Sequence, residues 1–199
     1  MSHKRIIVFV KNTIPGKVKT RLAKTIGDEE ALEVYLQLLN ITKKEVLGLN
    51  IEREVWYAWE IGKDDIWDEN HFNKRVQQDG DLGEKMNNAF RQSFEEGMNK
   101  VVLIGSDCPT LTSSILEEAF QKLDESDVVF GPSKDGGYYL IGMSSYYPEV
   151  LDNIAWSTEK VMDQTEEKAN QNNIKLSKLV TLNDIDNESD WNEYLGSIK

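Results

Sequence analysis

Cysteine and histidine are scarce in this sequence of 199 residues. A single cysteine, Cys108, excludes an internal disulfide and is typical of a reducing compartment. The two histidines lie far from Cys108 in the sequence, and the pattern G-x-S-x-G is absent. We therefore do not expect the covalent catalysis of cysteine or serine hydrolases.

Long apolar runs and net positive charge are also lacking. No apolar run is long enough to span a membrane, and the amino terminus has no signal-peptide pattern. The formal net charge is -12, which makes the chain a poor counterion for nucleic acid or an anionic membrane. We expect a cytoplasmic, soluble protein that binds neither. Nucleotide phosphates can still bind an acidic protein through a local basic cluster or a divalent cation.

The sequence does contain strands and helices in alternation, over a length that suits one domain, residues 1–199. Short apolar and β-branched runs predict strands at 5–10, 54–59, 75–78, 101–104, 127–131, 138–143 and 175–180. Helices are predicted at 28–47, after Asp81, after Thr112 or Ser113, from Ser157 or Thr158 to about Asn170, and at 190–195. This order predicts an α/β protein with a mostly parallel sheet and helices on both faces.

A basic loop, Lys11–Leu22, follows the first predicted strand. It contains Pro15, Gly16 and four basic residues. Because ligands bind at the carboxyl ends of the strands in open α/β sheets, the loop is well placed for phosphates. Neither the Walker A spacing nor G-x-G-x-x-G is present. The alternative is a solvated loop whose lysines bind nothing.

Acidic side chains follow the later strands. Asp107 comes directly after the strand 101–104, Asp135 lies in the next inter-strand loop, and an acidic run spans 184–190. Carboxylates hold Mg²⁺ or Mn²⁺, which bridges to a diphosphate. Each acid also has a plainer interpretation. Asp107 would cap a turn, Asp135-Gly136-Gly137 would form only a hairpin turn, and the acidic run would be a solvated face.

Two further segments have both structural and functional interpretations. Asp81 and Glu84 have the spacing of a capping box, whereas the backbone of residues 80–83 would close on a ligand. Trp156 would either staple the following helix, which we favour, or line the mouth of a pocket.

Four motifs carry a family resemblance over nearly the whole chain: KNTIPGKVKTRLA at 11–23, QDGDLGEKM at 78–86, IGSDCPTL at 104–111 and GPSKDGGYYLIG at 131–142. The chain resembles the DUF2064 family, also described as selenodomain-associated transferase 1-like or glycosyltransferase A-like. Two positions depart from the expected pattern. Thr13 replaces a proline and Lys85 replaces an arginine, and neither change removes a charge from the site.

The resemblance implies a GT-A-type nucleotide-diphospho-sugar transferase fold, a three-layer α/β/α sandwich. It implies that Asp107 and Asp186 hold Mg²⁺ or Mn²⁺ and that Lys19 and Arg21 grip phosphates. The resulting site has catalytic Asp107 and Lys19, with a phosphate-binding set of Lys11, Gly16, Lys19, Thr20, Arg21, Gly80 and Asp81. The predicted substrate-binding residues are Asp135, Gly136, Gly137, Tyr138 and Trp156.

Three functions are consistent with this pattern. The first is a glycosyltransferase-like enzyme that uses a nucleotide-diphospho-sugar and a small-molecule acceptor. The second is a nucleotidyltransferase that joins a nucleoside triphosphate to a small phosphorylated substrate and releases pyrophosphate. The third is a nucleotide-binding module without activity. Pyrophosphate release separates the second function from the other two.

Overall fold

The computed structural model describes residues 3–198 and contains a seven-stranded sheet in the order β3-β2-β1-β4-β6-β5-β7. The strands are β1 (Lys4–Val10), β2 (Glu52–Tyr57), β3 (Asn73–Val76), β4 (Lys100–Ile104), β5 (Val128–Pro132), β6 (Tyr138–Met143) and β7 (Leu176–Lys178). All neighbouring pairs are parallel except those made by β6, which runs antiparallel to both β4 and β5. The mostly parallel sheet is confirmed.

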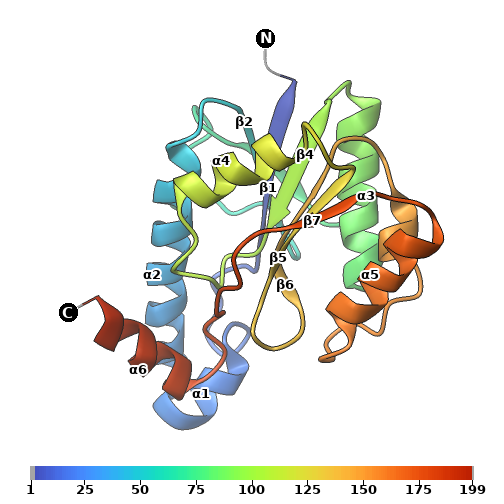
Figure 1. The fold of residues 1–199 in the computed structure, drawn as a ribbon. Helices are drawn as coiled ribbons and strands as arrows, with labels where there is room; N and C mark the ends of the chain where they lie inside the picture. The colour runs from blue at the N-terminus through green and yellow to red at the C-terminus, as the bar shows by residue number, and fades with distance from the viewer. Residues whose placement is uncertain (1–2, 199) are drawn as a thin grey trace.

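Helices cover both faces of the sheet, as the alternating pattern predicts (Figure 1). In Figure 1, α2 (Asp28–Leu47) and α4 (Ser113–Lys122) lie on one side, with α3 (Leu82–Glu95) and α5 (Val161–Gln171) on the other. Side chains of β1 alternate between two apolar cores: Ile6 and Val8 face α2 and α4, whereas Ile7 faces α3. The predicted three-layer α/β/α sandwich is confirmed.

Three further helices occur in the described residues: α1 (Thr20–Ile26), the 3₁₀ helix η1 (Pro148–Leu151) and α6 (Glu188–Ser197). Helix α1 begins inside the segment that the sequence predicts as a loop and continues beyond it, because Pro15 and Gly16 break only the part before Thr20. A third apolar cluster joins α1, α2 and α6 around Leu22 and Ile185. Within residues 3–198, no helix combines the length and hydropathy needed to cross a bilayer.

Several predicted boundaries are wrong by two to four residues. Strands β2 and β3 each begin two residues earlier than predicted and end two residues earlier, which leaves Trp59 in a loop. Helix α5 begins at Val161 rather than at Ser157 or Thr158. The Thr158 hydroxyl donates to the carbonyl of Ala155 instead of capping the helix, and Ser157 has a φ of 64°.

Candidate functional site

Lys19 and Asp107 meet at the carboxyl ends of β1 and β4. The Lys19 Nζ lies 2.6 Å from Asp107 Oδ1 and donates to the main-chain carbonyl of Ile185 at 2.7 Å. The Lys19 side chain is only 5% exposed, whereas that of Asp107 is 46% exposed. One buried ammonium therefore joins the loop after β1 to the loop after β4 and to the acidic run before α6.

Two further contacts bind the acidic run to this edge. The Ile185 N–H donates to the main-chain carbonyl of Asp107 at 2.9 Å. Arg21 Nη1 donates to Asp186 Oδ2 at 2.9 Å, with both side chains substantially exposed. The basic loop, Asp107 and the acidic run therefore lie together at this edge of the sheet.

Asp184 is the acid of this run that the sequence-based site omits. It is half-buried, and burial together with the charges of Asp107 and Asp135 raises the pKa of its carboxyl to about 7. Lys19 opposes this shift. Asp184 therefore lies within electrostatic reach of the acids from β4 and the β5–β6 hairpin, while Asp186 is paired with Arg21. The sequence signal for Asp184 is its place in the acidic run 184–190.

The donor set at this edge fits a divalent cation in one particular way. Carboxylate oxygens suit Mg²⁺ or Mn²⁺. Within the described range 3–198, no three acidic, histidine or cysteine side chains are close enough to enclose a cation on their own. The residues present therefore fit a cation held by one or two carboxylates, with phosphates and water completing its shell, which is the usual arrangement for Mg²⁺.

A buried tyrosine, Tyr35, connects the loops after β1 and β4. The Tyr35 hydroxyl accepts from the Lys11 N–H at 2.8 Å and donates to the Lys11 carbonyl at 3.2 Å. It also accepts from the Ser106 hydroxyl at 3.4 Å, next to Asp107. Burial raises the Tyr35 pKa, so the hydroxyl stays neutral. The contact fixes the first residues after β1 and β4, and the Lys11 side chain itself is exposed.

A groove of about 600 Å³ lies beyond the ends of β2 and β3. Its lining consists of Ala58, Trp59, Val76, Gln77, Gln78 and Asp79. Asn12 couples this groove to the loop after β1, because its side chain donates to the Glu60 carbonyl and accepts from the Trp59 N–H. The Trp59 indole is 51% exposed. Neither Asn12 nor Trp59 carried a signal that reasoning from the sequence recognised.

The segment after the groove starts α3. Asp81 accepts from the Glu84 N–H and Glu84 accepts from the Asp81 N–H, so the predicted capping box is present. Gly80 directly precedes this cap. The structural interpretation of Asp81 is confirmed, and a ligand role for Gly80 and Asp81 stays a prediction.

Asp135 is held in the hairpin turn between β5 and β6. Its Oδ1 accepts from the Ser133 hydroxyl at 2.5 Å and from the Gly137 N–H at 3.0 Å. Gly136 has a φ of 87°, and a Cβ there would collide with the carbonyl of Glu159. The turn interpretation is confirmed for this loop, which packs against the segment that leads into α5.

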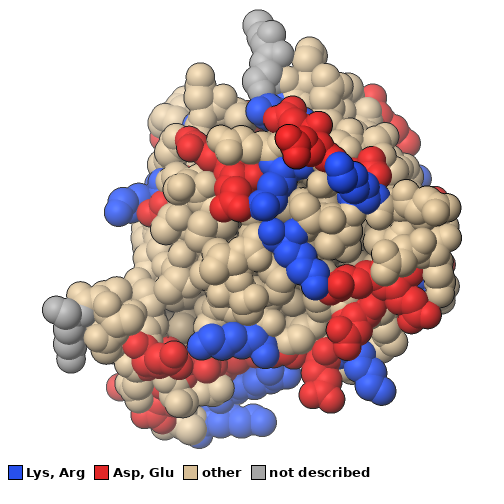
Figure 2. Space-filling model, in the orientation of Figure 1, with Lys and Arg blue, Asp and Glu red and all other residues tan. Residues whose placement is uncertain are grey.

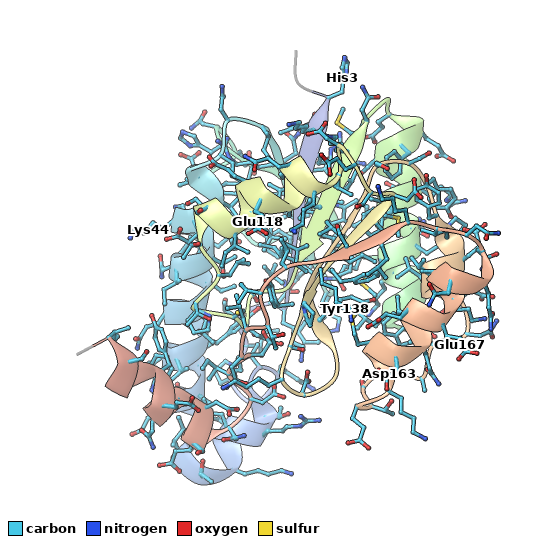
Figure 3. All side chains as sticks on the ribbon, viewed as in Figure 1. His3, Lys44, Glu118, Tyr138, Asp163 and Glu167 are labelled. Atoms are coloured by element: carbon cyan, nitrogen blue, oxygen red, sulfur yellow. The ribbon has the colours of Figure 1, made fainter. Side chains whose placement is uncertain are left out.

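Tyr138 and Trp156 lie beside this hairpin. Figure 3 labels Tyr138 on the side of the sheet that α5 covers. Its ring packs edge-on against Trp156, with centroids 6.3 Å apart, and no residue among 3–198 bonds its buried hydroxyl. Trp156 also packs on Gly83 of α3, where a Cβ would strike the indole. Trp156 therefore bridges α3 and the hairpin.

The remaining predicted residues, Gly16 and Thr20, lie in the segment from the end of β1 to the start of α1. Gly16 is in a turn closed by the Lys17 N–H and the Ile14 carbonyl, and Thr20 is the first residue of α1.

Cys108 is buried, and burial, with the charge of Asp184, raises the pKa of its thiol to about 12. This agrees with the expectation that Cys108 is not a nucleophile. Figure 2 shows Lys and Arg among Asp and Glu along the lower margin, the end where α1 lies.

The fold and the position of the site define a class. A candidate nucleotide-diphospho-sugar transferase from Desulfovibrio desulfuricans G20 has a crystal structure that superposes with a TM-score of 0.92. It is 34% identical, and the match covers 100% of this chain and 89% of that chain. The chain therefore has the nucleotide-diphospho-sugar transferase fold, as predicted.

The chain belongs to the family described as "Uncharacterized protein conserved in bacteria (DUF2064)", whose model matches residues 44–158. Two curated relatives are 2-phospho-L-lactate guanylyltransferases. That of Methanocaldococcus sp. strain FS406-22 is 26% identical over 136 residues, covering 65% of this chain and 55% of that protein. That of Methanocaldococcus fervens is 25% identical over 180 residues, covering 89% and 79%. The chain thus spans little more than half of the first relative. These comparisons support the predicted transferase class.

Proposed function

We propose that this protein is a nucleotidyltransferase that joins a nucleoside triphosphate to a small phosphorylated substrate and releases pyrophosphate. The observation that carries the proposal is the buried Lys19 contact with Asp107 and with the Ile185 carbonyl. It brings basic and acidic groups from three distant segments to one sheet edge. The names of the guanylyltransferase relatives favour nucleotidyl over glycosyl transfer and make GTP the first donor to test.

The exposed basic residues and the buried Lys19 have different proposed roles. Lys11 and Arg21 reach solvent and are available to triphosphate oxygens. Lys19 is buried, so its role is to hold Asp107 and the acidic run in place. Asp107 and either Asp184 or Asp186 would hold Mg²⁺ or Mn²⁺. That cation would neutralise charge on the phosphates.

In the proposed reaction, a phosphate oxygen of the acceptor attacks the α-phosphorus of the triphosphate. The new phosphorus–oxygen bond forms as the bond between the α-phosphorus and the α,β-bridging oxygen breaks. Pyrophosphate departs with the electron pair of that bond. Lys11 and Arg21 stabilise the negative charge that grows on this leaving group. Tyr138 and Trp156, beside the hairpin, form the proposed acceptor side.

An assay of pyrophosphate release tests this function. GTP, ATP, CTP and UTP are each incubated with Mg²⁺ or Mn²⁺ and a panel of small phosphorylated acids. Release that depends on both the triphosphate and the acceptor supports the proposal. Asp107→Asn is expected to reduce the rate by at least about 100-fold, since it removes a carboxylate that would hold the cation against the reacting phosphates. Asp163→Asn is the control, because Asp163 is an exposed acid on α5 (Figure 3).

Glycosyl transfer remains a second candidate because the relative from Desulfovibrio desulfuricans is named for nucleotide-diphospho-sugars. In that case a nucleoside diphosphate leaves and no pyrophosphate forms. Donor-dependent release of a nucleoside diphosphate, with no pyrophosphate from any triphosphate, would reverse the choice. Nucleotide binding without release of either product would support a binding module.

A further inference from the structure

A chain of side-chain hydrogen bonds runs along α3 and ends at the groove. Arg75 Nη1 donates to Gln92 Oε1 at 3.2 Å. Gln92 Nε2 donates to Asn88 Oδ1 at 2.6 Å, and Asn88 Nδ2 donates to Gln78 Oε1 at 2.7 Å. Gln78 lines the groove beyond β2 and β3. We call Arg75, Gln92, Asn88 and Gln78 the amide relay.

The direction of the amide relay follows from its first member. An amide has one end that donates and one that accepts, so a chain of amides by itself can run either way. A guanidinium only donates. Gln92 must therefore turn its carbonyl to Arg75 and its NH₂ to Asn88. The same constraint then applies to Asn88 and to Gln78. The Gln78 carbonyl accepts from the Asn88 NH₂ group.

Arg75 is itself firmly held, so it can impose this direction. Its Nε donates to the fully buried Glu54 at 3.0 Å, and its Nη2 donates to Glu96 at 2.8 Å. Asn88 is 7% exposed, which keeps water from competing for the middle of the relay. Gln78, in contrast, is exposed, and no hydrogen bond within residues 3–198 uses its Nε2. The NH₂ group of Gln78 is left to face the groove.

We propose that the amide relay fixes Gln78 so that its NH₂ donates to an acceptor atom of the nucleobase in the groove. This inference rests on the proposed function, because it assigns the groove to the base of the triphosphate. Guanine matches such a donor, since O6 and N7 are adjacent acceptors. The neighbouring Trp59 indole offers a flat surface for the same base. Gln92, Asn88 and Arg75 are positioning residues, and Gln78 is the residue that contacts the ligand.

Gln92→Glu tests the relay at a distance from the ligand. The carboxylate that it introduces keeps the acceptor for Arg75 and adds an ion pair, so we expect a folded protein. A carboxylate cannot donate to Asn88. Asn88 should then turn its NH₂ to the new carboxylate and its carbonyl to Gln78, and the Gln78 NH₂ should turn inward.

Asn88→Asp is the second variant, because its carboxylate also accepts from Gln78. Asn87→Asp is the charge-matched control, since the Asn87 side chain accepts from the Tyr146 hydroxyl and has no part in the relay.

Two readouts separate this inference from the proposed function. The first needs no ligand: ¹⁵N–¹H spectra of the Gln78 side-chain amide, assigned by its loss in Gln78→Glu. We expect Gln92→Glu and Asn88→Asp to shift these signals downfield and slow their exchange with water, while Asn87→Asp leaves both unchanged. Unchanged Gln78 signals in both folded relay variants would overturn the relay.

The second readout is the dissociation constant of GTP, measured by calorimetry on the same proteins. We expect Gln92→Glu to weaken GTP binding by about tenfold, because a donor is replaced by a repelling carbonyl. Asn87→Asp should stay within about twofold of the unmodified protein. An inverted amide with unchanged GTP affinity would overturn the contact with the base and leave the proposed function intact. No GTP binding by the unmodified protein would overturn this contact, and the proposed function would then depend on pyrophosphate release from another triphosphate.

Discussion

At the scale of single residues, Lys19 joins backbone strain to a buried charge. Its φ of 46° lies in the left-handed region, which residues with a side chain seldom adopt. The conformation is maintained because the ammonium contacts Asp107 and the Ile185 carbonyl together. Such a residue affects both stability and the position of the acids, whereas the exposed Lys11 affects neither through packing.

Replacing Lys19 by Met tests this difference. We expect Lys19→Met to lower the free energy of unfolding by about 1–3 kcal/mol, because it leaves a carbonyl and a carboxylate without their donor. Pyrophosphate release should fall through kcat. Lys11→Met should leave stability within about 0.5 kcal/mol and raise KM for the triphosphate instead. Urea unfolding and steady-state kinetics measure both effects. Equal effects of the two variants on stability would contradict the bridging role of Lys19.

Cys108 gives a prediction about pH. Burial raises the pKa of its thiol to about 12, so at neutral pH the reactive thiolate is scarce. We expect iodoacetamide to leave Cys108 unmodified at about neutral pH in the folded protein and to label it fully in urea. Mass spectrometry of the intact protein measures the labelling. Rapid labelling under native conditions would show that the thiol is accessible and ionised.

At the scale of elements, apolar runs and helix caps carried most of the information. The helix over 28–47 was predicted to the residue, because its apolar positions recur at three- and four-residue steps and Gly48 follows. The strand predicted at 54–59 ends too late, because Ala58 and Trp59 extend the β-favouring run past Tyr57. The pairing of β2 with β1 stops at Tyr57. Whether a chain continues as a strand depends on a partner strand, and a single sequence does not show the partner.

The capping box of α3 gives a prediction at this scale. Asp81→Ala removes the acceptor for the Glu84 N–H and should lower the free energy of unfolding by about 1 kcal/mol. Asp79→Ala is the control, because Asp79 is an exposed acid two residues earlier. Urea unfolding curves compare the two. If the variants lose the same stability, charge rather than capping explains the effect.

At the scale of the whole molecule, sequence order was enough to predict which loops meet but not how their side chains pair. Carboxyl ends of parallel strands share an edge, so the loops after β1 and β4 had to lie together. The rise of the Asp184 pKa to about 7 depends on burial and on charges from three other segments, those of Asp107, Asp135 and Lys19. The amide relay depends likewise on contacts between β3 and α3 that no local pattern encodes.

Buried charges connect strands β1, β2 and β3. Glu54 of β2 is 0% exposed and lies between Arg5 of β1, at 3.4 Å, and Arg75 of β3, at 3.0 Å. The Trp56 indole N–H also donates to Glu54, at 2.8 Å. Both guanidiniums extend to Glu96 at the end of α3. Three adjacent strands and a helix therefore share one set of charges, and removing the central acid leaves two cations together.

Replacing Glu54 by Gln tests how much the molecule depends on this set. We expect a loss of about 3–5 kcal/mol in the free energy of unfolding, since both guanidiniums lose the one carboxylate partner that is fully buried. Glu166→Gln is the control, because Glu166 pairs with Lys178 at the surface and should lose less than about 1 kcal/mol. Urea unfolding measures both. Because Arg75 also begins the amide relay, Glu54→Gln should disturb the Gln78 amide signals, and Glu166→Gln should not. A small stability loss with unchanged amide signals would mean that Glu96 alone is sufficient to hold Arg75.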